Sequence, residues 1–184
     1  MMRMFFLFCL VLVVAGCGEE HLPAEASGRG FSFSDSERME DSISRLYFLI
    51  NERRKEAGVP LLLWSVELAD LAAAQAHDLC ERGYLSHINP EGEDPLVRAI
   101  KGQAGRFFCE PVIPNPFLLI GENIGEGFER AEDVLAAWMV SPLHCKNILD
   151  ERYSFIGIGK CDSDGYFHCG CGDHWVVIFG AGMY

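Results

Sequence analysis

The chain has 184 residues, a length that points to one domain of ordinary size or two small ones. Its 27 acidic and 15 basic residues leave a net charge of −12, which argues against a general nucleic-acid binder because phosphate neutralisation needs a basic surface. A hydrophobic fraction of 49% excludes a disordered chain and suffices for a sizeable core, although part of it lies in the first sixteen residues.

The N-terminus has the features of an export signal. Arg3 precedes the apolar run 4–14, and these eleven residues are too few to span a bilayer as a helix, which takes about 20. Two small residues directly precede Cys17, and this ending resembles the lipobox of bacterial lipoproteins, in which the cysteine is acylated. We therefore expect residues 1–16 to be a lipoprotein signal peptide, with an ordinary secretory signal as the alternative.

An acylated Cys17 would anchor an otherwise soluble domain to a membrane. Loss of the signal removes Arg3 and no acid, so the net charge becomes −13 and anionic headgroups should repel the domain, leaving the acyl chains to hold it. Residues 17–34, small and polar, are expected to form a flexible stalk after the acylated cysteine. Gly18 is not the aspartate associated with inner-membrane retention in enterobacteria, so the expected location is the periplasmic or cell-surface side, with the outer membrane preferred.

Two helices open the predicted folded domain, residues 35–184. An N-cap at Asp35–Ser36 and apolar residues at helical spacing predict a long first helix that ends at Gly58. Ser65 is a plausible N-cap for a second, Ala-rich helix that ends at Gly83. Its small residues allow close packing against a sheet or another helix.

Two more helices are predicted in the middle of the chain. Asp94–Pro95 is typical of a helix start, and the short helix should run to about Lys101. Residues 103–119, with three prolines, are interpreted as an ordered loop. The acidic residues of 129–133 favour the start of a fourth helix, which Pro142 should stop.

The last third of the chain predicts strands. Phe155–Gly159 and Trp175–Phe179 are short apolar or alternating runs, and Asp162–Gly165 between them is a strong turn signal. Helices first and antiparallel strands last predict an α+β fold, a small sheet covered by helices.

Eight cysteines are present, of which Cys9 leaves with the signal and Cys17 takes the lipid. An even set of six in an exported domain suggests up to three disulfides, with about 15 connectivities left open. The six candidates are Cys80, Cys109, Cys145, Cys161, Cys169 and Cys171.

No familiar catalytic or nucleotide-binding motif occurs, which disfavours a nucleotide-dependent enzyme and a standard serine hydrolase. The candidates for chemistry are His87, Glu122 and His144, interpreted as loop or helix-end residues, where sites are usually built. Each also has a structural explanation, because a histidine can interact with a helix dipole and a Glu-Asn pair can bond its own backbone.

Three further possibilities receive weaker support. Cys145 beside His144 could be a nucleophile, but adjacent residues usually point apart and an oxidising compartment favours a disulfide. The run 168–174, with two cysteines and two histidines, could bind zinc, although a hairpin held by a disulfide is the preferred interpretation. His77 on the second helix is interpreted as a packing or surface residue.

An ordered set of motifs along residues 46–180 resembles the bacterial branch of the CAP superfamily. That superfamily comprises cysteine-rich secretory proteins, antigen five and pathogenesis-related proteins, and its fold is also called the SCP domain. The residues that carry the resemblance are Asn51, Arg54, Gly58, Leu63-Trp64, Leu68-Ala69, Ala72, Ala76-His77, Ser86-His87, Gly121-Glu122-Asn123-Ile124, Ala137-Trp138-Met139, Ser141-Pro142, His144, Asn147-Ile148-Leu149 and Phe155-x-Gly157-x-Gly159.

The resemblance implies an α-β-α sandwich with a small central antiparallel sheet, and a cleft of two histidines and acidic residues that holds zinc in some members. By position these are His87, His144 and, as one acid, Glu122. Two positions depart from the family pattern: Ser141 stands where many eukaryotic members have a second glutamate, and Cys145 stands where bacterial members usually have arginine.

Three functions remain open after the resemblance. The favoured one is a binding or interaction module on the cell envelope, with a metal site at His87 and His144 and a protein, peptide or lipid ligand that the sequence does not identify. The second is a zinc-dependent hydrolase acting on envelope peptide or peptidoglycan, with Glu122 as general base or ligand. The third is a carrier of a lipid or sterol-like ligand whose pocket involves the loop 107–119.

Overall fold

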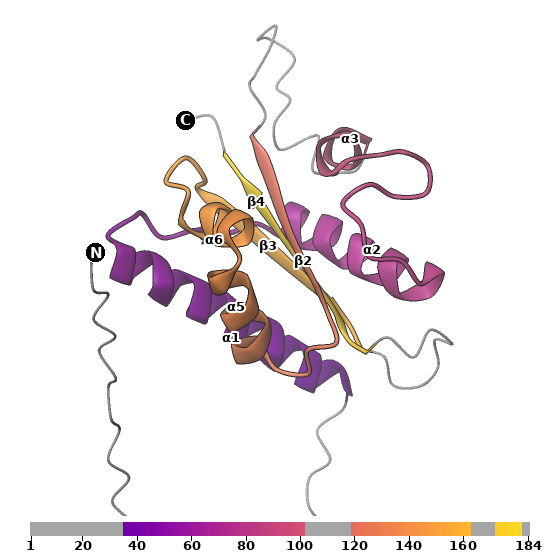
Figure 1. The fold of residues 1–184 in the computed structure, drawn as a ribbon, viewed down its shortest axis with the longest axis horizontal. Helices are drawn as coiled ribbons and strands as arrows, with labels where there is room; N and C mark the ends of the chain where they lie inside the picture. Colours follow the sequence, from indigo (N-terminus) through magenta and orange to yellow (C-terminus); the bar gives the residue numbers. More distant parts are fainter. Residues whose placement is uncertain (1–34, 102–118, 163–171, 182–184) are drawn as a thin grey trace, which may run out of the picture. The chain divides into compact units, whose positions relative to one another are not determined.

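Helices on both faces of a small sheet make up the part of the chain that the structure, a computed structural model, describes: residues 35–101, 119–162 and 172–181 (Figure 1). The predicted signal peptide and stalk lie outside these residues. The elements are α1 (Asp35–Ala57), β1 (Leu63–Trp64), α2 (Val66–Arg82), α3 (Pro95–Lys101), β2 (Ile120–Glu126), α5 (Ala131–Val140), α6 (Pro142–Leu149), β3 (Phe155–Cys161) and β4 (His174–Gly180).

The predicted helix boundaries are confirmed, together with the local chemistry that sets them. The Ser65 hydroxyl accepts the N–H of Leu68 at 3.2 Å, which caps α2, and Gly83 ends that helix in the left-handed region at φ 64°. Asp94 accepts the N–H of Val97 at 2.8 Å at the start of α3.

Three elements differ from the sequence-based prediction. Pro142 ends α5 as predicted, but it is also the first residue of α6, because proline fits the first turn of a helix. Glu122 was interpreted as a loop or helix-end residue, but the stretch Ile120–Glu126 that contains it is strand β2. The two-residue strand β1 had no recognisable sequence pattern.

The sheet has the strand order β1-β3-β4-β2. The predicted strands β3 and β4 pair antiparallel, as expected, and β2 also pairs antiparallel with β4, whereas β1 pairs with β3 in parallel, so the sheet is mixed. All seven residues of β4 are buried, which is expected for a strand with neighbours on both sides and helices on both faces.

Two hydrophobic clusters lie on opposite faces of this sheet, which makes an α-β-α sandwich. Alternate residues of β4 point to opposite faces, so Val177 belongs to the cluster with residues of α1, α5 and α6, while Val176 belongs to the cluster with residues of α2. Gly157 and Gly159 of β3 let α2 lie directly on the sheet, because a Cβ at either would collide with the α2 backbone.

Arg54 ties α1 to the segment that follows α6. It is fully buried, and its guanidinium donates to the carbonyls of Pro60, Ile148, Asp150 and Tyr153 at 2.7–3.3 Å. Burial lowers the pKa of Arg54, while nearby Asp150 acts in the opposite direction. This arginine therefore fixes the end of α6, which carries part of the candidate site.

Candidate functional site

The structure brings His87, Glu122 and His144 to one cavity of about 340 Å³. His87 follows α2, Glu122 belongs to β2, and His144 belongs to the first turn of α6. The remaining lining residues are Leu143, Lys146, Asn147, Asp150, Arg152 and Tyr153. The interpretation of Glu122 as a loop residue is wrong, since it lies inside a strand that pairs along its length with β4.

Both carboxylate oxygens of Glu122 have partners. Oε1 lies 2.8 Å from Nδ1 of His87, and Oε2 accepts from Nη2 of Arg98 at 2.5 Å. The Glu122 side chain is 1% exposed and that of Arg98 is 9% exposed, so this is a buried ion pair. Arg98 also donates to the backbone carbonyls of His87 and Glu93. Arg98 therefore holds both the Glu122 carboxylate and the backbone of His87.

This contact fixes the orientation of the His87 ring. A carboxylate that accepts from Nδ1 selects the tautomer in which Nε2 has the free lone pair. The His87 side chain is 47% exposed, so its outer edge is open to solvent. Glu122 thus supports His87 as an acceptor or metal ligand, and each of its oxygens already has a partner.

His144 is positioned by amide side chains of β2 and α6. The Asn123 amide donates to the His144 carbonyl at 3.1 Å, and the Asn147 amide donates to Asn123 Oδ1 at 3.0 Å and to the Glu122 carbonyl at 3.2 Å. Burial lowers the pKa of His144, and the neighbouring His87 lowers it further. A lowered pKa favours the neutral imidazole, the form that binds metals.

The far wall of the cavity carries charged and phenolic groups. The Arg152 guanidinium beside Asp150 holds the pKa of that carboxyl below its usual range. Burial raises the pKa of Tyr153. A Cβ at Gly121 would collide with the Tyr153 hydroxyl, so the glycine before Glu122 is required for Tyr153 to reach the cavity.

The residues support a two-histidine metal site rather than a complete ligand cage. Within residues 35–101, 119–162 and 172–181, no group of three or more His, Cys, Asp or Glu side chains is arranged to hold a metal ion. Two imidazoles facing one cavity, one of them backed by a carboxylate, nevertheless match the donor chemistry of zinc.

The other sequence candidates are placed only in part. Among the cysteines that the structure describes, Cys80 and Cys161 are buried together in the core cluster under α2, Cys145 lies in α6, and no disulfide is seen. The remaining disulfide candidates, the predicted lipid acceptor Cys17 and nearly all of the 107–119 loop lie outside the described residues. So do residues 168–171 of the possible zinc-binding run 168–174. His77 is exposed on α2, as predicted for a surface residue.

Arg98, which holds Glu122, is the first of several residues that sequence reasoning missed. It lies in α3, which has only seven residues, too few for periodicity to show that one of its basic side chains points inward. Asn123, Asn147 and Tyr153 were also not proposed as site residues, although the two asparagines belong to the segments that carry the family resemblance.

Comparison with known proteins identifies a family. Residues 47–179 match the sequence profile of the CAP, or cysteine-rich secretory protein, family. The chain is 30% identical over 115 residues to the uncharacterized protein YkwD of Bacillus subtilis, and 25% identical over 111 residues to the uncharacterized membrane protein YlbC of the same organism. These matches cover 62% and 60% of the chain but only 40% and 29% of the two relatives.

Solved structures show the same fold. An outer surface protein of Borrelia burgdorferi superposes with a TM-score of 0.66 at 24% identity, over 79% of this chain and 96% of that one. An extracellular SCP-domain protein of Bacillus anthracis gives a TM-score of 0.65 at 24% identity, over 84% of this chain and 45% of that one. None of the helices in the part of the chain that the structure describes has the length and apolar character needed to cross a membrane.

Proposed function

We propose that the chain, which belongs to the cysteine-rich secretory protein (CAP) family, is a binding module of the cell envelope whose cleft holds a zinc ion. The reason is that His87 and His144 line one cavity and that Glu122 lies behind His87. The observation that carries the proposal is the chain of contacts from Arg98 through Glu122 to His87. A carboxylate behind a histidine is the usual second partner of a metal-binding imidazole.

His87 and His144 would hold the zinc, and the protein donors would leave positions open for a ligand. Bound zinc supplies a Lewis acid that attracts carboxylate, carbonyl or imidazole groups. Glu122 orients the His87 ring, while Asn123, itself held by Asn147, fixes the backbone of His144. The module would therefore recognise a ligand by one donor group at the metal.

A binding role is favoured over hydrolysis by the state of Glu122. A general base must reach a water molecule in the cleft, but Oε1 is committed to His87 and Oε2 to Arg98. The carboxylate therefore acts through His87, as a positioning residue.

Isothermal titration of the purified chain with zinc tests the site. We expect binding that is lost in the His87→Ala/His144→Ala variant and retained in His77→Ala, the matched control, because His77 lies exposed on α2 outside the cleft. Glu122→Gln should weaken zinc binding about 10–100-fold without abolishing it. Equal zinc affinity in the double variant and in the native chain would refute the metal site.

We also propose that the chain is exported and anchored through an acyl group on Cys17. The sequence of the N-terminus supports this proposal, and the Bacillus anthracis and Borrelia burgdorferi proteins with the same fold are described as extracellular and outer surface proteins. Labelling of cells with an alkyne-bearing fatty acid should tag the native chain and leave Cys17→Ser untagged. Tagging of Cys17→Ser to the same extent would contradict the assignment.

A further inference from the structure

The cavity that the two histidines line, called here the histidine cleft, has one positive charge without a partner. Glu122 pairs with Arg98 behind the cleft, so these two charges offset each other. Asp150 and Arg152 form a second ion pair on the cleft wall. Lys146 of α6 lines the same cavity, is exposed, and forms no ion pair within the described residues. The histidine cleft is therefore positive in a chain whose net charge is −12, and a bound zinc ion would add to its attraction for an anion.

Two polar atoms of the cleft residues have no hydrogen-bond partner in the part of the chain that the structure describes. Tyr153 is only 4% exposed, yet its hydroxyl, which lies against Gly121, bonds to no described group. The Asn147 amide nitrogen donates to Asn123 Oδ1 and to the Glu122 carbonyl, while its own oxygen, Oδ1, accepts no bond there. A hydroxyl and an amide oxygen in the wall of a cavity are satisfied by water or by a ligand.

The available donors suit a carboxylate better than a phosphate. Arginine, which holds phosphate through two parallel N–H bonds, is already engaged here, since Arg98 donates to Glu122 and Arg152 donates to Asp150. What remains is one ammonium group, one hydroxyl and the proposed zinc. A carboxylate has two oxygens, and zinc, ammonium and hydroxyl groups all bind carboxylate oxygens.

The cleft also offers contacts for the group that carries the carboxylate. Leu143 lines the cavity and is 77% exposed, so an apolar side chain of the ligand would cover it. Oδ1 of Asn147 would accept an N–H, such as that of a peptide bond. A carboxylate, a side chain and an amide N–H occur together at the C-terminal end of a peptide.

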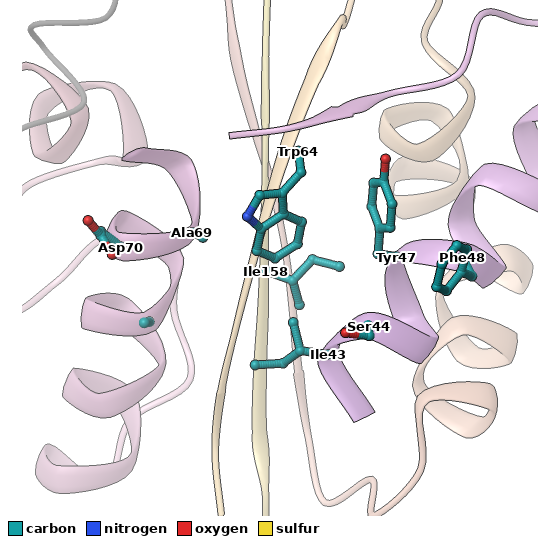
Figure 2. A pocket seen from close by; sticks show the side chains of 9 residues that line it. Ile43, Ser44, Tyr47, Phe48, Trp64, Ala69, Asp70 and Ile158 are labelled. Atoms are coloured by element: carbon teal, nitrogen blue, oxygen red, sulfur yellow. The ribbon is translucent and has the colours of Figure 1, made fainter. Parts of the chain in front are cut away.

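The larger apolar pocket beside β1 lacks these groups. It has a volume of about 520 Å³ and lies at the other edge of the sheet from β2. Figure 2 shows Trp64 and Ile158 at the sheet, with Ile43 and Tyr47 on α1 beside them. The charged residue in its lining is Asp70, whose carboxylate would repel an anion. This pocket therefore provides a control position for apolar contact.

We propose that the histidine cleft binds the C-terminal residue of a peptide whose last side chain is apolar. The carboxylate would bind the zinc with one oxygen and would bind Lys146 and the Tyr153 hydroxyl with the other. The last side chain would cover Leu143. Capture of a C-terminal carboxylate is an established mode of peptide recognition. The inference rests on the proposed function for its metal contact, and it names the ligand class of that site.

Selection of heptapeptides displayed with free C-termini on the zinc-loaded chain tests this proposal. Enriched peptides should end in a large apolar residue. The best peptide is then synthesised both as the free acid and as the C-terminal amide, and fluorescence polarisation measures the two affinities. We expect the amide to bind at least about tenfold more weakly, because it lacks the charge that zinc and Lys146 attract. Octanoate, an apolar carboxylate without a peptide bond, should compete poorly with the acid.

Variants of the cleft assign the contacts. Lys146→Met and Tyr153→Phe should each weaken binding of the acid about tenfold and change binding of the amide little, and Lys146→Arg should restore the affinity. Lys55→Met, which removes an exposed lysine of α1 outside the cleft, is the matched control. Leu143→Ser should reduce the preference for an apolar last residue, whereas Trp64→Ala in the other pocket should leave it unchanged.

Zinc titration and thermal unfolding of every variant separate this inference from the proposed function. Neither Lys146 nor Tyr153 is a proposed zinc ligand, so their variants should bind zinc as the native chain does. Equal binding of the acid and the amide by a zinc-loaded chain would overturn the inference and leave the zinc site standing. Displacement of the peptide by octanoate at equal concentration would overturn the assignment to a peptide. A native chain that binds no zinc would overturn both proposals.

Discussion

Removal of the Arg98 guanidinium should strongly destabilise the fold, because Glu122 would be left as a buried carboxylate without its cation. Nη2 of Arg98 lies 2.5 Å from Oε2 of Glu122, and the Glu122 side chain is only 1% exposed. Loss of one partner of a buried ion pair costs about 3–5 kcal/mol of unfolding free energy, whereas replacement of both partners by groups of similar shape is often nearly neutral. We therefore expect Arg98→Met to cost about 3–5 kcal/mol.

A double-mutant cycle separates the ion pair from packing. Urea unfolding followed by circular dichroism should show that Arg98→Met/Glu122→Gln is destabilised by less than the sum of the single variants, with a coupling energy of about 2–3 kcal/mol. The control is Arg82→Met, since the bonds of Arg82 to Asp78 and Glu91 are at the surface and should contribute little. Additive effects in the cycle, or an Arg98→Met variant as stable as Arg82→Met, would refute the reasoning.

Three further predictions concern the frame of the site. Gly159→Ala should lower the unfolding free energy by about 2–3 kcal/mol, since its Cβ would meet the backbone of α2; a urea midpoint equal to that of the native chain would contradict the close packing. Trp138→Phe should cost about 1–3 kcal/mol in the same assay, because the Ile124 carbonyl loses the buried indole donor at 2.9 Å, and no loss would show that another group satisfies it. The pKa of Asp150 is lowered in the fold, so its contribution to stability is present above the ordinary value of 3.8 and is lost as the pH falls through the lower folded pKa. The melting temperature of Asp150→Asn should therefore fall less steeply in acid than that of the native chain. An unchanged acid dependence would count against this assignment.

The helical part of the fold could be predicted because its signals are local. Ser65 and Gly83 delimit α2 by their own side-chain and backbone chemistry, and the apolar spacing in α1 needs no distant partner. The strand β2 could not be predicted in this way, because its glycines and polar residues suit a strand only where other elements complete it. Gly121 makes room for Tyr153, and Asn123 has its amide partners in α6.

The candidate site could likewise be predicted only in part from the sequence. The ordered motifs were sufficient to nominate His87, Glu122 and His144, and the structure places all three around one cavity. The role of each residue could not be predicted from the sequence. Glu122 was considered as a general base or a ligand, and only its contacts show that both of its oxygens already have partners. Arg98 determines that outcome from 24 residues away in sequence.

The sequence by itself therefore determined four of the five described helices, the two central apolar strands, the family and the three residues of the cleft, because each depends on side-chain types at short spacing or on an ordered set of motifs. Tertiary structure alone decided that β2 is a strand and that Arg98 pairs with Glu122 behind His87. These features depend on which segments pack together, and no local pattern encodes a buried charge pair.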